Sequence, residues 1–283
     1  MTLIPAVVAG ICDDAAIFPP GLARLEDAVP AHLRHESSEY AELVGPLIVG
    51  VAVLDELAGL VQDLPSAALA VSVTVPTPDQ VGAVRAGLES MPGVRLEALE
   101  VALPAEMPTD QVVPALEAAT SGLDVPVFVE VPRDARRPGI LAALATTRYL
   151  AKFRTGGVKA ELYPDEAELA AAIAETTRLG LPFKATAGLH HAIRNTDPET
   201  TFEQHGFLNI LCAVDAALLG ADETQLVTVL SDRHAPGIAQ RIAGLSADRV
   251  AAARRHFISF GTCSVTDPLT ELTELGLIGA GSA

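Results

Sequence analysis

The sequence predicts a single (β/α)₈ barrel, an α/β fold in which eight parallel strands alternate with helices. The 283-residue chain alternates short apolar runs with helical patterns, at a spacing of roughly 25 to 35 residues. The apolar runs are continuous rather than alternating, which is typical of parallel strands that are buried on both faces. Eight such units in about 250 residues match the usual length of this barrel.

The expected strands are the apolar runs that end in glycine, proline or polar residues. They lie at residues 15–18, 47–53, 70–75, 95–103, 125–131, 150–154, 183–187 and 257–263. The expected helices lie at 25–44 with a break at Pro30, then 55–64, 80–89, 110–120, 139–147, 165–179, 206–219, 223–229, 247–256 and 268–275.

The alternation of strands and helices stops after the seventh expected strand, because residues 192–256 hold several helices in succession. We expect them to form a helical insertion between strands seven and eight, within one domain that spans residues 1–283. A doubly wound open sheet is the alternative fold. That fold normally has a glycine-rich phosphate loop after its first strand, and Phe-Pro-Pro-Gly at 18–21 is not one.

Composition excludes several classes of partner. The formal net charge of −17 argues against nucleic acid and anionic membranes, which need a basic face. Cys12, Cys212 and Cys263 form no disulfide or zinc pattern, which favours a reducing cytoplasm. Residues 1–11 lack the basic start of a signal peptide, and no apolar run approaches a membrane span. We expect a small anionic substrate, and leave open an assembly of identical subunits.

Two lysines stand inside runs that are typical of buried strands. Lys152 begins Lys-Phe-Arg-Thr-Gly-Gly and Lys184 begins Lys-Ala-Thr-Ala-Gly-Leu-His-His. A charge in an apolar strand is costly unless it has a partner or a function. The two stretches are 32 residues apart with a helical pattern between them, as neighbouring parallel strands would be. We therefore expect both amines to enter one pocket at the carboxyl ends of the strands.

Side-chain alternation sorts the residues of these strands into two faces. Apolar residues such as Phe153 and Phe183 should meet the helices, so the polar set should face the barrel axis. On the preceding strand, Glu130 is the only charged residue of its run. The residues that this alternation turns inward are Phe128, Glu130, Lys152, Arg154, Lys184, Thr186 and Gly188.

The two amines suggest a chemistry. At about 6 Å and an effective dielectric near 20, they would repel each other by roughly 3 kcal/mol. That repulsion could leave one amine neutral near pH 7, as Schiff-base formation with a carbonyl requires. The alternative is that each lysine is held by a carboxylate such as Glu130. Arg154 would grip a carboxylate or phosphate, or form a structural ion pair with Glu130 or Glu161.

Three stretches resemble the class I aldolase superfamily of TIM barrels, and within it the deoxyribose-phosphate aldolase branch. Its members carry Lys-Thr-Ser-Thr-Gly, Lys-x-x-Gly-Gly-x-Arg and Phe-Gly-Ala-Ser on strands six, seven and eight. This chain has Lys-Phe-Arg-Thr-Gly at 152–156, Phe-Lys-Ala-Thr-Ala-Gly at 183–188 and Phe-Gly-Thr-Cys-Ser at 260–264. The resemblance implies that Lys152 is the Schiff-base lysine and Lys184 its electrostatic activator.

The resemblance also implies an anion site near Gly188, Gly261 and Ser264, where the family's loops hold phosphate. It covers the C-terminal third of the chain, and the first five strands carry no clear family motif. Arg154 replaces a small residue of the family beside the lysine. The loop residues that complete the expected substrate-binding set are Thr155, Gly156, Gly157 and Thr186.

Histidines supply further candidates. His190 and His191 are adjacent, so at most one faces the pocket, where it could act as a general acid or base. His205 and Asn209 lie four residues apart on one helix face. They could approach the pocket from above, although capping or packing is the favoured interpretation. The spacing is not that of a known metal motif, so we expect no metal and no organic cofactor.

Two further positions have structural alternatives. Cys263 lies on the last expected strand and is interpreted as a small core residue. Asp13 and Asp14 precede the first expected strand, and one of them could reach the pocket or cap a turn.

The leading hypothesis is a Schiff-base lyase for an anionic carbonyl substrate, with Glu130 or a histidine as proton carrier. A metal-assisted isomerase or hydrolase that uses the histidines and Glu130 is the second. A non-catalytic barrel that binds an anion is the third.

Overall fold

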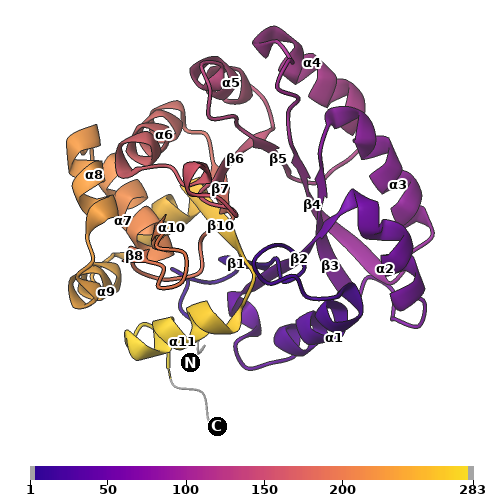
Figure 1. Ribbon diagram of the computed structural model, residues 1–283, viewed down its shortest axis with the longest axis horizontal. Coiled ribbons are helices and arrows are strands. Elements are labelled where there is room, and N and C mark those ends of the chain that lie inside the picture. The colour runs from indigo at the N-terminus through magenta and orange to yellow at the C-terminus, as the bar shows by residue number, and fades with distance from the viewer. Residues whose placement is uncertain (1–3, 280–283) are drawn as a thin grey trace.

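The structure, a computed structural model, describes residues 4–279. Within these residues eight parallel strands close into a barrel, which confirms the predicted fold (Figure 1). The barrel closes because the first strand pairs with both the second and the last. The strands are β1 (Cys12–Asp14), β2 (Val44–Gly50), β3 (Leu69–Val75), β4 (Val94–Val101), β5 (Val127–Glu130), β6 (Leu150–Arg154), β7 (Phe183–Thr186) and β10 (Phe257–Thr262).

Helices follow the strands and form a layer around the barrel (Figure 1). The helices that come before β7 are α1 (Leu25–Glu36), α2 (Leu54–Leu60), α3 (Val81–Glu89), α4 (Thr109–Thr120), α5 (Arg137–Leu144) and α6 (Glu166–Leu179), and α11 (Thr266–Glu274) follows β10. Short 3₁₀ turns are η1 (Ala41–Leu43), η2 (Val51–Val53), η3 (Pro78–Gln80) and η4 (Ala160–Leu162). No helix in the described range is long and apolar enough to cross a membrane.

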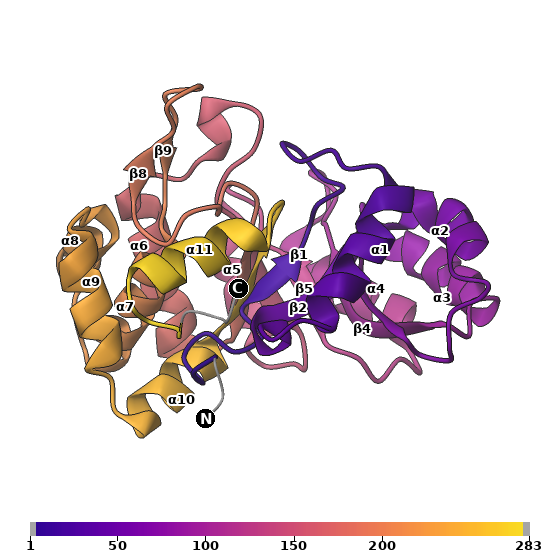
Figure 2. The same cartoon turned by 90° about the horizontal axis from the view of Figure 1, so that it is seen from below.

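The segment between β7 and β10 is the predicted insertion, and it contains a hairpin as well as helices. Figure 2 shows the hairpin projecting from the barrel, and two of the inserted helices pack against α6. The inserted elements are β8 (Asn195–Thr196), β9 (Glu203–Gln204), α7 (Phe207–Leu218), α8 (Glu223–Ser231), α9 (Ala235–Ala243) and α10 (Ala247–His256). Because α7 packs against β10, α6 and the other inserted helices, all its residues from 207 to 216 are buried.

The first strand is the largest difference from the sequence-based prediction. We expect a strand at 15–18, but the barrel uses β1, whose residues pair with Phe260, Gly261 and Thr262 of β10. Residues 15–18 form the turn that follows. Adjacent aspartates are typical of a turn, and here both are buried with partners: Asp13 contacts Lys184, and Asp14 contacts His32.

Two helices also differ. Helix α1 continues through Pro30 and ends at Glu36, so the predicted break at the proline is wrong. Helix α9 is absent from the prediction because Pro236 and Gly237 in its first turn look like a loop. Proline is well tolerated in a first turn, where its missing N–H needs no partner.

The core lies between the strands and the helices, as side-chain alternation predicts. Phe153 and Phe183 point outward and lie 5.3 Å apart between ring centroids, and Phe183 stacks on Phe257. Phe128 points inward, toward Lys184. The apolar outer faces hold the strands rigidly, so the inward polar residues have fixed positions.

Candidate functional site

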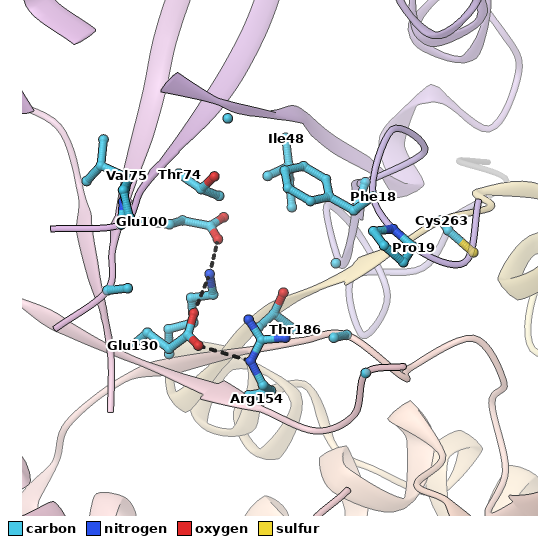
Figure 3. Close-up of a pocket in the computed structure, with 18 of the residues that line it drawn as sticks. Phe18, Pro19, Ile48, Thr74, Val75, Glu100, Glu130, Arg154, Thr186 and Cys263 are labelled. Carbon is cyan, nitrogen blue, oxygen red and sulfur yellow. Dashed lines mark hydrogen bonds and ion pairs between the residues drawn. The ribbon is translucent and has the colours of Figure 1, made fainter. Parts of the chain in front are cut away.

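A cavity of about 500 Å³ lies at the carboxyl ends of the barrel strands. Its charged lining residues are Glu100, Glu130, Lys152 and Arg154, from β4, β5 and β6. Figure 3 shows Glu100, Glu130 and Arg154 together, with Phe18 and Ile48 across the cavity from them. The cavity therefore has a charged wall and an apolar wall, at the end of the barrel that the sequence predicts.

Lys152 supplies an amine to this cavity. Its Nζ lies 2.8 Å from Oε2 of Glu100 and 3.1 Å from Oε2 of Glu130. The register of β5 and β6 pairs Glu130 directly with Lys152, which explains the second contact. Only 5% of Lys152 is exposed, so its amine meets carboxylates and the cavity rather than bulk water.

Lys184 occupies a more enclosed position. It pairs in register with Lys152, but it is 1% exposed and does not line the described cavity. Its Nζ donates to Asp13 and lies 2.6 Å from Oε1 of Glu100. Burial opposes the charge of Lys184, but the two carboxylates outweigh it and raise the pKa well above its usual range. Lys184 therefore stays protonated.

Glu100 links the two lysines, one on each carboxylate oxygen. Ser72 also donates to Oε1, at 3.0 Å. Burial opposes the charge of Glu100, but both lysines together hold its pKa well below the usual range. The prediction of two uncompensated, repelling amines is therefore wrong, because a carboxylate stands between them. The alternative that carboxylates hold each lysine describes the structure.

Asp13 completes this cluster at its buried end. Its Oδ2 accepts from Lys184 and, at 2.8 Å, from Ser259. Burial raises the pKa of Asp13 although the lysine acts in the opposite direction. With a permanently protonated Lys184 in contact, we take the carboxyl as ionised at neutral pH. The cluster of alternating charges is Asp13, Lys184, Glu100, Lys152, Glu130 and Arg154.

Arg154 ends the cluster at the cavity. Its Nε donates to Oε1 of Glu130 at 3.0 Å, and 38% of its side chain is exposed. Burial opposes the charge of Glu130, but Lys152 and Arg154 lower its pKa below the usual range. In the part of the chain that the structure describes, Glu130 is the only hydrogen-bond partner of this guanidinium. Its two terminal nitrogens therefore remain available in the cavity.

The adjacent histidines separate, as predicted. His190 lines the cavity, and its Nδ1 lies 3.3 Å from Sγ of Cys263. Burial lowers the pKa of His190 and raises that of Cys263. Cys263 also lines the cavity, so its interpretation as a core residue is wrong. His191 turns away to Glu271, 2.6 Å from its Nδ1, and the hydrogen bond raises the pKa of His191.

His205 and Asn209 hold the insertion together rather than reaching the cavity, which agrees with the favoured interpretation. Nε2 of His205 lies 2.8 Å from the carbonyl oxygen of Pro164. The Asn209 amide accepts from the backbone N–H of Arg194 and donates to two carbonyl groups at the end of α8. Both side chains are fully buried.

His205 should make the stability of the protein depend on pH. Burial, aided by the charge of Arg194, lowers the pKa of His205 to about 4. In the unfolded chain the value is near 6.5, so the neutral ring contributes about 3 kcal/mol to the free energy of unfolding above pH 6.5. This contribution is lost as the pH falls from 6.5 to about 4. Urea unfolding at a series of pH values measures it.

In His205→Gln the decline over this pH range should be shallower than in the wild type by about 3 kcal/mol. His234→Asn is the control, because His234 is exposed and asparagine keeps a side-chain acceptor at the start of α9. Equal slopes in His205→Gln and the wild type would contradict the prediction.

The glycine stretches are only partly at the cavity. Gly157, Thr186 and Gly261 line it, whereas Thr155, Gly156, Gly188 and Ser264 do not. Gly188 has a φ of +68°, and a Cβ there would lie 2.8 Å from the Cα of Gly156. The two glycines therefore allow the loops after β6 and β7 to pack on each other, with Tyr163 against both.

The residues considered for a metal are not brought together. His190, His191 and His205 have different partners, and only His190 shares the cavity lining with Glu130. Within residues 4–279, no three histidine, cysteine or carboxylate side chains form a group that could hold a metal ion.

Sequence alternation predicts Glu130, Lys152, Arg154 and Lys184 correctly as inward residues, but Glu100 is missed. The expected strand 95–103 holds three charged residues, so Glu100 does not stand out as Glu130 does. Asp13 is named only as one of two aspartates that could reach the pocket, because alternation cannot choose between them as long as the first strand is placed at 15–18.

Comparison with known proteins finds similarity among solved structures only. No family model matches the sequence, and no curated protein matches it. Similar solved structures include deoxyribose phosphate aldolase from Aeropyrum pernix, a tetramer, with 15% identity, a TM-score of 0.39, and 96% of this chain and 93% of that chain covered. Dihydrodipicolinate synthase from Oceanobacillus iheyensis has 12% identity, a TM-score of 0.37, and coverage of 96% and 97%. The chemistry of the site has to come from its own residues.

Proposed function

We propose that the protein is a lyase of the Schiff-base aldolase type that acts on an anionic carbonyl compound, with Lys152 as the nucleophile. One observation carries the proposal: the Lys152 amine lies in the cavity wall, in contact with carboxylates on two neighbouring strands. A carbonyl carbon in the cavity can approach this nitrogen. The motif resemblance on β6 assigns the same role to Lys152.

The first step forms the imine. The ammonium gives a proton to a carboxylate, the free amine attacks the carbonyl carbon, and the oxygen leaves as water. In total, an ammonium and a carbonyl become an iminium and a water, so two protons pass from nitrogen to oxygen. Glu130 is suited to this transfer because it contacts Lys152 and is accessible from the cavity.

The second step breaks a carbon–carbon bond. The bond between the α and β carbons of the bound substrate breaks, and its electron pair moves toward the iminium nitrogen to give an enamine. A base takes the β-hydroxyl proton, and that fragment leaves as a second carbonyl compound. Protonation of the enamine and addition of water then release the first fragment. His190, on another part of the cavity lining, is a second candidate proton carrier.

In this proposal Lys184 stabilises the cluster rather than forming the imine. It is protonated and enclosed by Asp13 and Glu100, so it cannot act as a nucleophile without losing both contacts. Its charge fixes Glu100, which in turn holds Lys152. Lys184 thus acts as a positioning residue.

Borohydride trapping tests the proposal directly. The sequence contains three lysines, Lys152, Lys159 and Lys184. Incubation with a panel of aldehydes and oxo acids followed by borohydride should add one reduced substrate per chain, and peptide mapping should place it on Lys152. Lys184 should stay unmodified because it is 1% exposed.

The matched control is Lys159→Met, which removes the exposed lysine and should keep full labelling. A panel in which no carbonyl compound labels Lys152, or in which labelling is confined to Lys159 and the amino terminus, would disprove the Schiff-base mechanism.

A further inference from the structure

We propose that the substrate is an oxo acid with a single carboxylate, the one β-hydroxyl that the cleavage step requires and an otherwise apolar carbon chain, and is not a sugar phosphate. The proposal rests on the function proposed above and deepens it. Three features of the cavity support it. The two terminal nitrogens of Arg154 are available, the charges in the lining balance, and the glycine loops make their contacts within the protein.

Arg154 presents a geometry that suits a carboxylate. Glu130 takes only Nε, and this contact orients the guanidinium at the cavity wall. The two terminal nitrogens left over can donate two parallel hydrogen bonds, which match the two oxygens of one carboxylate. Because Lys152 and Arg154 lie two residues apart on one face of β6, a carboxylate on Arg154 brings a nearby carbonyl group toward Lys152.

The charges of the lining favour one negative charge over two. Among the described lining residues, Lys152 and Arg154 are balanced by Glu100 and Glu130. A phosphate monoester brings close to two charges into a wall whose cations are already paired, whereas a carboxylate brings one.

A single anion also assists catalysis. A carboxylate bound to the terminal nitrogens of Arg154 repels Glu130 and offsets the charge of the guanidinium, so the pKa of Glu130 rises from its lowered value. Glu130 then accepts a proton from Lys152 more readily. Binding of the substrate would thus prepare the amine for attack.

Most of the loop groups expected to hold a phosphate are engaged within the protein, and only Gly157 and Gly261 among these glycines line the cavity. Gly156 and Gly188 pack on each other beneath Tyr163, outside the described cavity lining. The hydroxyl of Thr155 donates to the carbonyl oxygen of Ala187, at 2.7 Å. The hydroxyl of Ser264 accepts from the backbone N–H of Asp267 in the first turn of α11. These groups therefore make packing contacts and hydrogen bonds within the protein.

The cavity wall opposite Arg154 favours a substrate with an apolar carbon chain. Much of the remaining lining is hydrophobic, and Figure 3 shows Phe18, Pro19 and Ile48 across the cavity from Arg154. A hydroxylated sugar would leave its polar groups without partners on this surface, which is costly in a buried site. An aliphatic chain of several carbons fits it. Other apolar residues of the lining are Val51, Val75 and Leu162, of which Val75 lies beside Glu100 (Figure 3).

Three probes separate the possibilities in the borohydride assay. They are 4-methyl-2-oxopentanoate, 3-methylbutanal, which has the same chain without the carboxylate, and glyceraldehyde 3-phosphate. The readout is the concentration that half-labels Lys152, in the wild type and in Arg154→Gln. The variant should raise this concentration for the oxo acid, relative to that for 3-methylbutanal, by about tenfold to hundredfold. The neutral aldehyde has no carboxylate for Arg154 to bind, so it corrects for any effect of the variant on the amine itself.

Arg178→Gln is the matched control, because Arg178 is an exposed arginine of α6. Arg154→Lys keeps the charge but not the planar edge, and should recover only part of the binding. A lower half-labelling concentration for glyceraldehyde 3-phosphate than for the oxo acid would overturn the proposal. An unchanged oxo acid value in Arg154→Gln would also overturn it.

Failure of the lyase proposal gives a different result from failure of the carboxylate proposal. In that case none of the probes labels Lys152, not even the neutral aldehyde. In that case thermal shift still decides the substrate class. Stabilisation by 4-methylpentanoate that is lost in Arg154→Gln supports the carboxylate site. Stabilisation by inorganic phosphate alone, or by neither probe, overturns it.

Discussion

Replacing Lys152 with methionine is expected to abolish imine formation while the barrel stays folded. Without the amine no covalent adduct can form, and turnover should fall on the order of 10³-fold or more. The carboxylates lose one partner each but remain paired, because Glu100 keeps Lys184 and Glu130 keeps Arg154. The free energy of unfolding should therefore change by less than about 2 kcal/mol.

Two measurements check this separation of activity from stability. Borohydride trapping with the best carbonyl probe should give no adduct in Lys152→Met, and urea unfolding should give a midpoint close to that of the wild type. Lys159→Met, at an exposed position, should behave as the wild type in both assays. Retained trapping on another lysine would move the reaction away from Lys152. A collapse of stability would instead make Lys152 a structural residue.

The two lysines illustrate what a sequence can predict about a buried site. Alternation along β6 and β7 places Lys152 and Lys184 on the inward face, because every second residue of a strand shares a face. It does not predict what lies between them. Both amines contact Glu100 of β4, and the structural difference between them comes from β1, whose Asp13 pairs with Lys184 although it is far from that lysine in the chain.

Long-range pairing therefore decides the roles that local patterns leave open. Glu100 and Lys184 are 84 residues apart, and Asp13 and Lys184 are 171 apart. The charge on one strand does not reveal which opposite charge it will meet across the barrel. A search for isolated charges within apolar runs finds Glu130, but the expected strand 95–103 holds three charged residues, so the search does not single out Glu100. Asp13 can be placed in the site only if the first strand is located at β1, and the two adjacent aspartates make that stretch look like a turn.

The same limit explains the histidines. His190 and His191 are adjacent and chemically alike, and the pattern predicts only that one of them faces the pocket. Glu271 on α11 pairs with His191, and this contact depends on where the last helix packs at the end of the barrel. His190 is left to face the cavity beside Cys263.

Replacing Lys184 with methionine is expected to destabilise the protein strongly, by about 3–5 kcal/mol, because it leaves a buried charge without its partner. Asp13 would keep only the hydroxyl of Ser259 among its side-chain contacts in the described structure, and 4% of its side chain is exposed. Glu100 would keep Lys152 and Ser72. The loss therefore comes mainly from Asp13, and urea unfolding at pH 7 measures it.

The pH dependence of the lost stability and a second substitution, at Asp13, show whether the unpaired Asp13 carboxylate causes the loss. Burial already raises the pKa of Asp13, and loss of Lys184 should raise it further, so protonation relieves the variant in acid. For a carboxyl with a raised pKa, stability is lost as the pH rises through the folded value, so the deficit of Lys184→Met should shrink as the pH falls toward the unfolded value near 4. Adding Asp13→Asn should recover part of the lost stability at pH 7. If Lys184→Met unfolds with the wild-type midpoint, or if Asp13→Asn adds to the loss, the two residues are not energetically coupled. In the first of these two outcomes the contrast with Lys152 would also disappear, because both lysines would be equally dispensable to the barrel.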